Sequence, residues 1–184
     1  IHVVWPRAIR IIRSIYPPID LFEDLADPED WEAIAAGESK SNPRLQESIG
    51  DLGKVPPDRR VAGPGASYVM PPFVHCSTDR PGRFTDGSFG IYYAGNSTPV
   101  AIAETVHHHA KFMLATDEEP GWTSQFRELV GSVDSVLDDA SNYPEYLDPD
   151  DYKPSQVFGA HRREADSNGI FWPSVRYPGG ECIG

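Results

Sequence analysis

The stretch RPGRFTDGSFGIYYAGNSTPVAIAETVHHHAKFM, residues 80–113, organises this chain. Its pattern predicts a glycine-punctuated loop that carries Arg83, a short strand over residues 89–94, a turn, and then a helix. The helix start is marked by Thr98 as the N-cap, followed directly by a proline, and Glu104 falls in the second helical turn. A cation, aromatic rings and a carboxylate are therefore delivered by consecutive elements of one β-turn-α unit.

Outward from this unit, short segments of strand-like and helix-like pattern follow one another without a regular alternation. Strands are predicted at residues 9–12, 68–76, 125–133 and 170–172, and helices at 21–25, 31–37, 43–49, 98–113 and 155–166. The prolines at positions 71 and 72 place the second of these strands at an edge or a bend. We therefore expect one α+β domain over residues 1–184, with a central twisted sheet and flanking helices.

The helix that follows Thr98 has two faces with different expected roles. Its apolar stripe, which we expect to face the core, consists of Ile102, Val106, Ala110 and Met113. Glu104 lies away from that stripe, so by itself it is most simply a residue of a solvated helix face. Its neighbours on that face are Val100, His107, His108 and Lys111. The other candidate residues have equally plain interpretations as loop, strand or turn residues, and only their combination points to chemistry.

The net charge of the chain bears on its binding partners, and its cysteines bear on its cellular compartment. Lys and Arg number 16 against 28 Asp and Glu, a formal net charge of −12. Direct nucleic-acid binding through a basic face is therefore not expected, whereas a basic protein partner would be compatible. There is no apolar run of about 18 residues and no signal-peptide pattern, and Cys76 and Cys182 lack a CxxC spacing. We therefore expect a cytoplasmic protein without a membrane span and with both thiols reduced.

The combination of Arg83, a tyrosine and Glu104 suits a ligand that is anionic, contains a sugar and becomes positive at its reacting centre. NAD⁺ has these properties, because its pyrophosphate is negative and its nicotinamide–ribose bond breaks through an oxocarbenium-like centre. A guanidinium suits phosphate oxygens, and a carboxylate beside the sugar can accept a hydroxyl hydrogen bond and offset the developing charge. NAD⁺ is expected as the substrate, with no separate cofactor.

Other chemistries have less support in the sequence. His107, His108 and His109 with Glu104 invite a metal site, but no second Cys or His cluster accompanies them, so no metal is expected. The segment GPGAS, residues 63–67, is neither a dinucleotide fingerprint nor a P-loop. A GxSxG elbow, which would indicate a serine hydrolase, is absent from the sequence.

Four pieces of the sequence together resemble one family. They are RAIRIIRSIYPPIDLFED near the start, PGRFTDGSFGIYYAG and PVAIAETVHHH in the middle, and GIFWPSVRYPGGEC near the end. In this order they resemble the RES-domain family, the toxin components of bacterial RES–Xre toxin–antitoxin pairs. The resemblance implies a mixed fold related to the ADP-ribosyltransferase fold and an activity that degrades NAD⁺ by hydrolysis or phosphorolysis.

Carried over position by position, the resemblance also implies the site. The implied catalytic residues are Glu104, Arg83, Tyr93 and Ser174, and the implied substrate-binding residues are Arg10, Arg83, Tyr92, Tyr93 and Ser174. Water, phosphate and a protein side chain remain open as the acceptor, so ADP-ribosyl transfer to a protein is an alternative activity. A non-catalytic module that holds a nucleotide or a partner's tail is a second alternative. As partners, the resemblance implies an Xre-family antitoxin that blocks the active site, and self-association.

Overall fold

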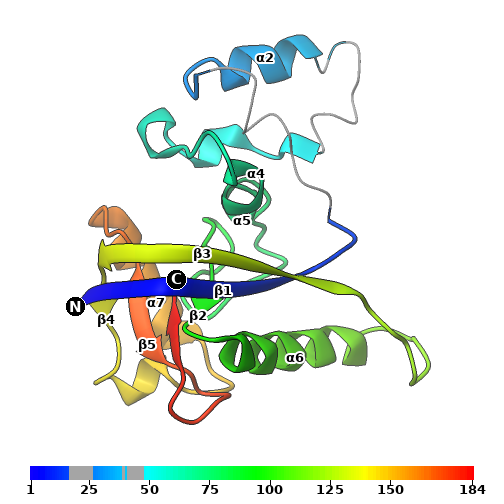
Figure 1. Cartoon of the computed structure of the whole chain (residues 1–184), viewed down its shortest axis with the longest axis vertical. Helices are drawn as coiled ribbons and strands as arrows, with labels where there is room; N and C mark the ends of the chain where they lie inside the picture. Colours follow the sequence, from blue (N-terminus) through cyan, green and yellow to red (C-terminus); the bar gives the residue numbers. More distant parts are fainter. Residues whose placement is uncertain (17–26, 39, 41–47) are drawn as a thin grey trace. The chain divides into compact units, whose positions relative to one another are not determined.

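The computed structural model describes residues 1–16, 27–38, 40 and 48–184 (Figure 1). They belong to two compact units. The sheet unit comprises Ile1–Tyr16 and Tyr93–Gly184, and the helical unit comprises Pro17–Tyr92. Helices and a mixed sheet are both present, so the α+β class predicted from the sequence is confirmed.

The sheet unit is built on a six-stranded sheet with the order β3-β1-β2-β6-β5-β4. Its strands are β1 (His2–Arg13), β2 (Ala94–Gly95), β3 (Phe126–Val136), β4 (Asp138–Asp139), β5 (Ile170–Pro173) and β6 (Glu181–Ile183). The pair β4 and β5 is parallel, and the other pairs are antiparallel. This unit also contains α6 (Thr98–Leu114), α7 (Lys153–Glu164) and the 3₁₀ turn η3 (Pro144–Tyr146). Both α-helices were predicted from the sequence.

β1 and β3 lie side by side over most of their length (Figure 1). Their antiparallel register is irregular between Trp5 and Ala8. Pro6 lies in this gap, and a proline has no N–H to donate to the ladder. Along β3, Arg127, Leu129, Val133 and Ser135 are half-buried and the even-numbered residues are exposed, which is the alternation of a strand with one covered face. The strands predicted at 9–12 and 125–133 are thus confirmed, and both extend further.

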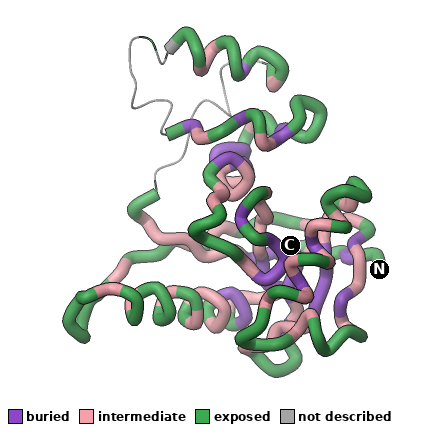
Figure 2. The backbone as a smooth tube through the Cα atoms, turned by 180° about the vertical axis from the view of Figure 1, so that it is seen from behind, coloured by how far each residue is buried: buried purple, intermediate pink, exposed green. Residues whose placement is uncertain are grey.

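The core of the sheet unit lies mainly on its central strands. Its buried hydrophobic residues are Val3, Ala8, Ile9, Ala94, Val100, Ala101, Leu137, Ala140, Ile170, Phe171, Trp172, Cys182 and Ile183. Figure 2 shows the buried positions along the strands and at the start of α6, whereas the far end of α6 is mostly exposed. The strand predicted at 170–172 is β5, and its three apolar residues are all buried.

The predicted core stripe of α6 is wrong. Ile102 and Val106 are 48% and 61% exposed, whereas Val100 is only 1% exposed. The helix therefore turns the face of Val100 inward. Residues four apart lie on one face of a helix, so Glu104 follows Val100 on the inward face one turn later.

Two glycines explain this orientation of α6. A Cβ on Gly95 would lie 2.8 Å from Cγ1 of Val100, and a Cβ on Gly180 would lie 2.4 Å from Cγ2 of Val100. Both distances are shorter than van der Waals contact, so the Val100 side chain occupies space that only glycine leaves open at these positions. The helix begins after Ser97 as the N-cap, one residue earlier than the predicted N-cap Thr98.

The strand predicted over residues 68–76 is wrong. The segment instead forms α4 (Ala66–Val69) and α5 (Pro71–Val74). The prolines lie in the first turn of α5, where the backbone N–H groups of a helix have no intrahelical partner anyway. A proline pair that would interrupt a strand is therefore well suited to begin a helix.

The strand predicted over residues 89–94 is also largely wrong. Only Ala94 belongs to a strand, the short β2, which pairs with β1 and β6. Before Ala94, the backbone at Gly90 packs so closely on α5 that no side chain would fit there. A Cβ on Gly90 would lie 2.2 Å from the carbonyl oxygen of Pro72. This segment is thus fitted against α5 rather than into the sheet.

The helical unit has a small core of its own. In addition to α4 and α5, it contains α2 (Trp31–Glu38) and the 3₁₀ turns η1 (Leu52–Lys54) and η2 (Pro57–Arg59). Its buried cluster consists of Trp31, Ile49, Leu52, Val55, Ala66, Met70 and Val74. The helix predicted at 31–37 is confirmed. The helix predicted at 21–25, and most of the one predicted at 43–49, lie outside the described residues.

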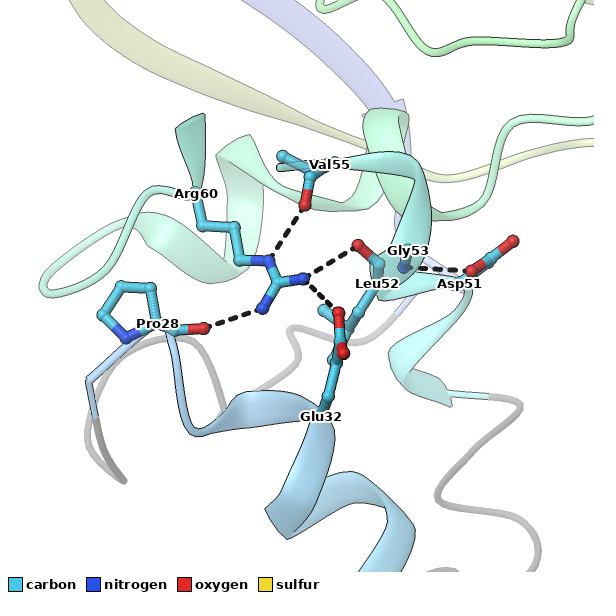
Figure 3. Close-up of polar contacts among 7 residues, drawn as sticks. All are labelled: Pro28, Glu32, Asp51, Leu52, Gly53, Val55 and Arg60. Atoms are coloured by element: carbon cyan, nitrogen blue, oxygen red, sulfur yellow. Dashed lines mark hydrogen bonds and ion pairs between the residues drawn. The ribbon is translucent and has the colours of Figure 1, made fainter. Parts of the chain in front are cut away.

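Arg60 joins three segments of the helical unit (Figure 3). Its side chain is 1% exposed and donates hydrogen bonds to the carbonyl oxygens of Val55 at 3.0 Å, Pro28 at 2.8 Å and Leu52 at 3.2 Å. It also pairs with the Glu32 carboxylate at 2.5 Å. A planar guanidinium can satisfy all these acceptors at once, which a lysine cannot.

Replacing Arg60 should therefore destabilise the protein. We expect Arg60→Met to lower the free energy of unfolding by about 3 kcal/mol, because it leaves buried carbonyl groups without donors and a carboxylate without its partner. The measurement is urea unfolding followed by circular dichroism. Arg59→Met, at the exposed neighbouring position, is the matched control. Equal losses in the two variants would contradict the role of Arg60.

Candidate active site

Glu104 is the predicted catalytic residue whose surroundings are most fully defined. It is half-buried in the second turn of α6, on the face that Val100 turns inward. Its Oε1 atom accepts a hydrogen bond from the hydroxyl of Ser174 at 2.7 Å. Ser174 directly follows β5, so the sheet unit brings together two predicted site residues that are 70 positions apart in the chain. The plain interpretation of Glu104 as a residue of a solvated helix face is therefore wrong.

The turn after β5 determines where the hydroxyl hydrogen of Ser174 points. The backbone N–H of Ser174 donates to the carbonyl oxygen of Gly180 at 2.8 Å. Its Oγ atom accepts from the backbone N–H groups of Arg176 at 3.2 Å and Tyr177 at 3.1 Å. A hydroxyl has two acceptor positions and one hydrogen. With both acceptor positions filled, Ser174 is a fixed donor to Glu104.

A buried thiol contacts the same carboxylate oxygen. Cys182 is 3% exposed, and its Sγ atom lies 3.8 Å from Oε1 of Glu104, within range of a weak S–H donor. The sequence does not mark this cysteine as a site residue. The hydrogen bonds that Glu104 accepts from described residues all end on Oε1, so Oε2 keeps its capacity to accept from a ligand.

Tyr93 and Arg10 also meet in the sheet unit. The ring of Tyr93 lies edge-on to the ring of Trp172, with 6.0 Å between their centroids. Nη1 of Arg10, on β1, donates to the backbone carbonyl oxygen of Tyr93 at 3.0 Å. Arg10 thus fixes the chain where it enters β2, in addition to any contact with a ligand.

Arg83 and Tyr92 belong to the helical unit, and their parts in a site stay predictions. Arg83 is 7% exposed, in a loop closed by a backbone hydrogen bond from Gly82 to Thr85 at 2.8 Å. Gly87 is required in this loop, because its φ is +95° and a Cβ would lie 2.0 Å from the Ser77 carbonyl oxygen. The loop that carries Arg83 is therefore rigidly built.

Two positively charged residues, Arg176 and Lys111, act together with Glu104 on His107, and the sequence alone does not mark either as a site residue. Nη2 of Arg176 donates to the carbonyl oxygen of Pro149 at 2.6 Å and to the hydroxyl of Tyr152 at 3.4 Å. Lys111, on α6, lies with its Nζ 5.9 Å from the centre of the Tyr152 ring. The signal for Arg176 was its position two residues after Ser174.

The pKa values of His107 and His108, one turn after Glu104 on α6, are affected by both negative and positive side chains. Loss of hydration lowers the pKa of His107, the positive charge of Arg176 lowers it further, and the Glu104 carboxylate raises it. Loss of hydration also lowers the pKa of His108, and the charge of His107 adds to this effect, again opposed by Glu104. An anionic and a cationic side chain therefore act on the same stretch of α6.

The described part of the chain contains neither a group of three metal-ligating side chains nor a helix that could cross a membrane. In that part, no group of three or more His, Cys, Asp or Glu side chains could hold a metal ion. No helix among the described residues is long and apolar enough to cross a membrane. Cys76 and Cys182 are both free cysteines.

The pKa values of His107 and His108 test this arrangement directly. Glu104→Gln should lower both pKa values, because it removes the nearby negative charge. Arg176→Gln should raise both, because it removes the repelling positive charge. The measurement is an NMR titration of the imidazole resonances. Glu164→Gln, at the end of α7, serves as the control and should leave both values unchanged. Shifts of the same sign in the two test variants would contradict the geometry.

Comparison with known proteins shows the family of this chain. The RES domain model matches residues 57–184, a range that includes Arg83, Tyr93, Glu104 and Ser174. A protein of Sinorhizobium fredii (strain NBRC 101917 / NGR234), named "Uncharacterized protein y4oC", is similar to this chain, with 32% identity over 111 residues. That match covers 60% of this chain and 47% of the relative, so the chain spans about half the length of the curated relative it matches. The family match extends over most of the chain, and we conclude that this protein belongs to the RES-domain family.

Proposed function

We propose that this protein is the toxin of a bacterial toxin–antitoxin pair and that it degrades NAD⁺ by cleaving the nicotinamide–ribose bond. The observation that carries the proposal is the Glu104 carboxylate, held by the Ser174 hydroxyl at 2.7 Å. Both residues are among those that the resemblance to RES-domain toxins implies for catalysis. Membership of the RES-domain family is consistent with the same activity.

Glu104 would act on the charge that develops during cleavage. The breaking bond sends its electron pair to the nicotinamide, which leaves as a neutral molecule, and positive charge develops on the ribose carbon. A carboxylate about 4 Å away, at an effective dielectric of about 20, attracts that charge by about 4 kcal/mol. An attraction of this size, if it acts only in the transition state, accelerates the reaction by about three orders of magnitude. Water then adds to the ribose carbon and loses a proton, which gives ADP-ribose.

The other site residues would position the substrate and the carboxylate. Ser174 would orient Glu104 rather than attack the sugar, because both acceptor positions of its oxygen are filled by the backbone N–H groups of Arg176 and Tyr177. Tyr93 offers an aromatic face and a hydroxyl to the nicotinamide ribose. The remaining residues implied by the resemblance, which are Arg10, Arg83 and Tyr92, would hold the rest of the dinucleotide.

A toxin that consumes NAD⁺ in the cell that makes it has to be inhibited until it acts. We propose that an Xre-family antitoxin covers the site and that the toxin self-associates in the complex. The net charge of −12 would favour association with a basic surface on that partner. The activity would be exerted in the cytoplasm.

Substitution of Glu104 tests the catalytic role. Glu104→Gln keeps the size of the side chain and removes its charge, so we expect NAD⁺ consumption to fall by about three orders of magnitude. The assay follows released nicotinamide by liquid chromatography. Glu164→Gln, which removes an exposed carboxylate at the end of α7, should retain full activity. Equal rates for wild type and Glu104→Gln would refute the proposal.

The products distinguish this function from its alternatives. NAD⁺ labelled in its adenosine moiety is incubated with the protein in phosphate-free buffer, in phosphate buffer and in a bacterial lysate. We expect the label in small molecules only, as ADP-ribose or as its phosphorylated form. Label on protein would instead indicate ADP-ribosyl transfer. Tight binding of NAD⁺ without consumption would indicate a non-catalytic nucleotide-binding module.

A further inference from the structure

NAD⁺ bears a negative pyrophosphate, so a site built around the Glu104 carboxylate needs a cation as well. Arg10, one predicted anion-binding residue of the sheet unit, already donates through Nη1 to the Tyr93 carbonyl oxygen. Arg176 is the arginine in the turn that follows Ser174. Its backbone N–H donates to Oγ of Ser174 at 3.2 Å, and the same Oγ donates to Glu104. A single hydroxyl therefore links the backbone of Arg176 to the carboxylate.

The guanidinium of Arg176 is held by hydrogen bonds but does not use all of its N–H donors. Its two side-chain hydrogen bonds, to the Pro149 carbonyl oxygen and the Tyr152 hydroxyl, both come from Nη2. Nε is buried and has no hydrogen-bond partner among the described residues. Nη1 likewise makes no hydrogen bond to any residue that the structure describes. The hydrogen bonds of Nη2 thus hold the guanidinium in place, and the two N–H donors of Nη1 stay available to a ligand.

The charges around Arg176 match a ligand whose own charges are separated. The positive charges of Arg176 and Lys111 and the negative charge of Glu104 all act on His107. Asp150 adds a weaker negative contribution. NAD⁺ likewise carries positive charge on the nicotinamide ring attached to its ribose and negative charge at its pyrophosphate. A ligand with the ribose at Glu104 and a phosphate at Arg176 would have each charge opposite its complement.

We propose that Nη1 of Arg176 binds a phosphate oxyanion beside the Glu104–Ser174 pair, an inference that rests on the proposed NAD⁺ chemistry at that site. Arginine suits this role because its charge is permanent and its donors are held in a plane. The oxyanion has two possible sources. It is either the pyrophosphate of the dinucleotide or the inorganic phosphate that would act as acceptor in phosphorolysis.

Calorimetric binding tests the proposal without requiring turnover. ADP-ribose carries the pyrophosphate but no nicotinamide, nicotinamide riboside carries no phosphate, and inorganic phosphate is the acceptor alone. We expect Arg176→Gln to weaken ADP-ribose binding by roughly ten- to a hundredfold, since a charge-assisted hydrogen bond is lost. Nicotinamide riboside binding should not change. Arg163→Gln, which removes an equal charge near the end of α7, should leave ADP-ribose binding unchanged.

Two further variants separate anion binding from support of the turn. Tyr152→Phe removes the hydroxyl that Arg176 contacts but leaves Nη1 intact, so ADP-ribose affinity should stay near the wild-type value. Arg176→Lys keeps the positive charge without the planar fork and should give an intermediate loss. If Tyr152→Phe weakens ADP-ribose binding as much as Arg176→Gln does, Arg176 only supports the turn and the proposal is wrong.

Each outcome either identifies the source of the oxyanion or rejects the anion site at Arg176. Weaker ADP-ribose binding in Arg176→Gln assigns the pyrophosphate, and weaker binding of inorganic phosphate alone assigns the acceptor. Unchanged binding of both, or no binding of either by the wild type, overturns the proposal. The two proposals can also fail separately. If Arg176→Gln weakens ADP-ribose binding but the wild type never consumes NAD⁺, the anion site stands and the proposed activity falls. If both proteins consume NAD⁺ with the same KM, only the anion site falls.

Discussion

The packing of Val100 against Gly95 and Gly180 is the contact on which the site depends. Both glycines leave room for its methyl groups, at distances where a Cβ would clash. This fixes the rotation of α6 about its axis and directs Glu104, one turn later, toward the interior. Gly180 also accepts the backbone hydrogen bond of Ser174 at 2.8 Å. The same glycine therefore shapes both the helix that carries the carboxylate and the turn that carries its donor.

The donors around Glu104 are neutral, and this suits the proposed chemistry. A hydroxyl and a thiol hold Oε1, so the position of the carboxylate is fixed while its charge is not cancelled by an ion pair with these donors. A carboxylate bound directly by a guanidinium would have less electrostatic effect on a developing cation. Arg176 instead contacts the serine, through its backbone N–H, which donates to Oγ of Ser174 at 3.2 Å.

Much of the fold followed from local pattern, and the errors have two causes. The helices at 98–113 and 155–166 and the strands at 125–133 and 170–172 carry periodicity that matches the observed elements. The predictions at 68–76 and 89–94 failed because close backbone contacts and proline-started helices replaced the expected strands. The apolar stripe of α6 was assigned to the wrong face, because hydrophobicity alone cannot show which side of a helix has space to pack.

The sequence by itself determined the types of the long elements (α6, α7, β1, β3 and β5), the acidic character and, through resemblance, the residues on which a site could be built. Only the tertiary structure decided that Glu104 faces inward, that the hydroxyl of Ser174 is its donor, and that the thiol of Cys182 lies against the same carboxylate oxygen. The physical reason is that these contacts join residues about 70 to 80 positions apart, and a hydrogen bond depends on atomic positions that no local pattern contains.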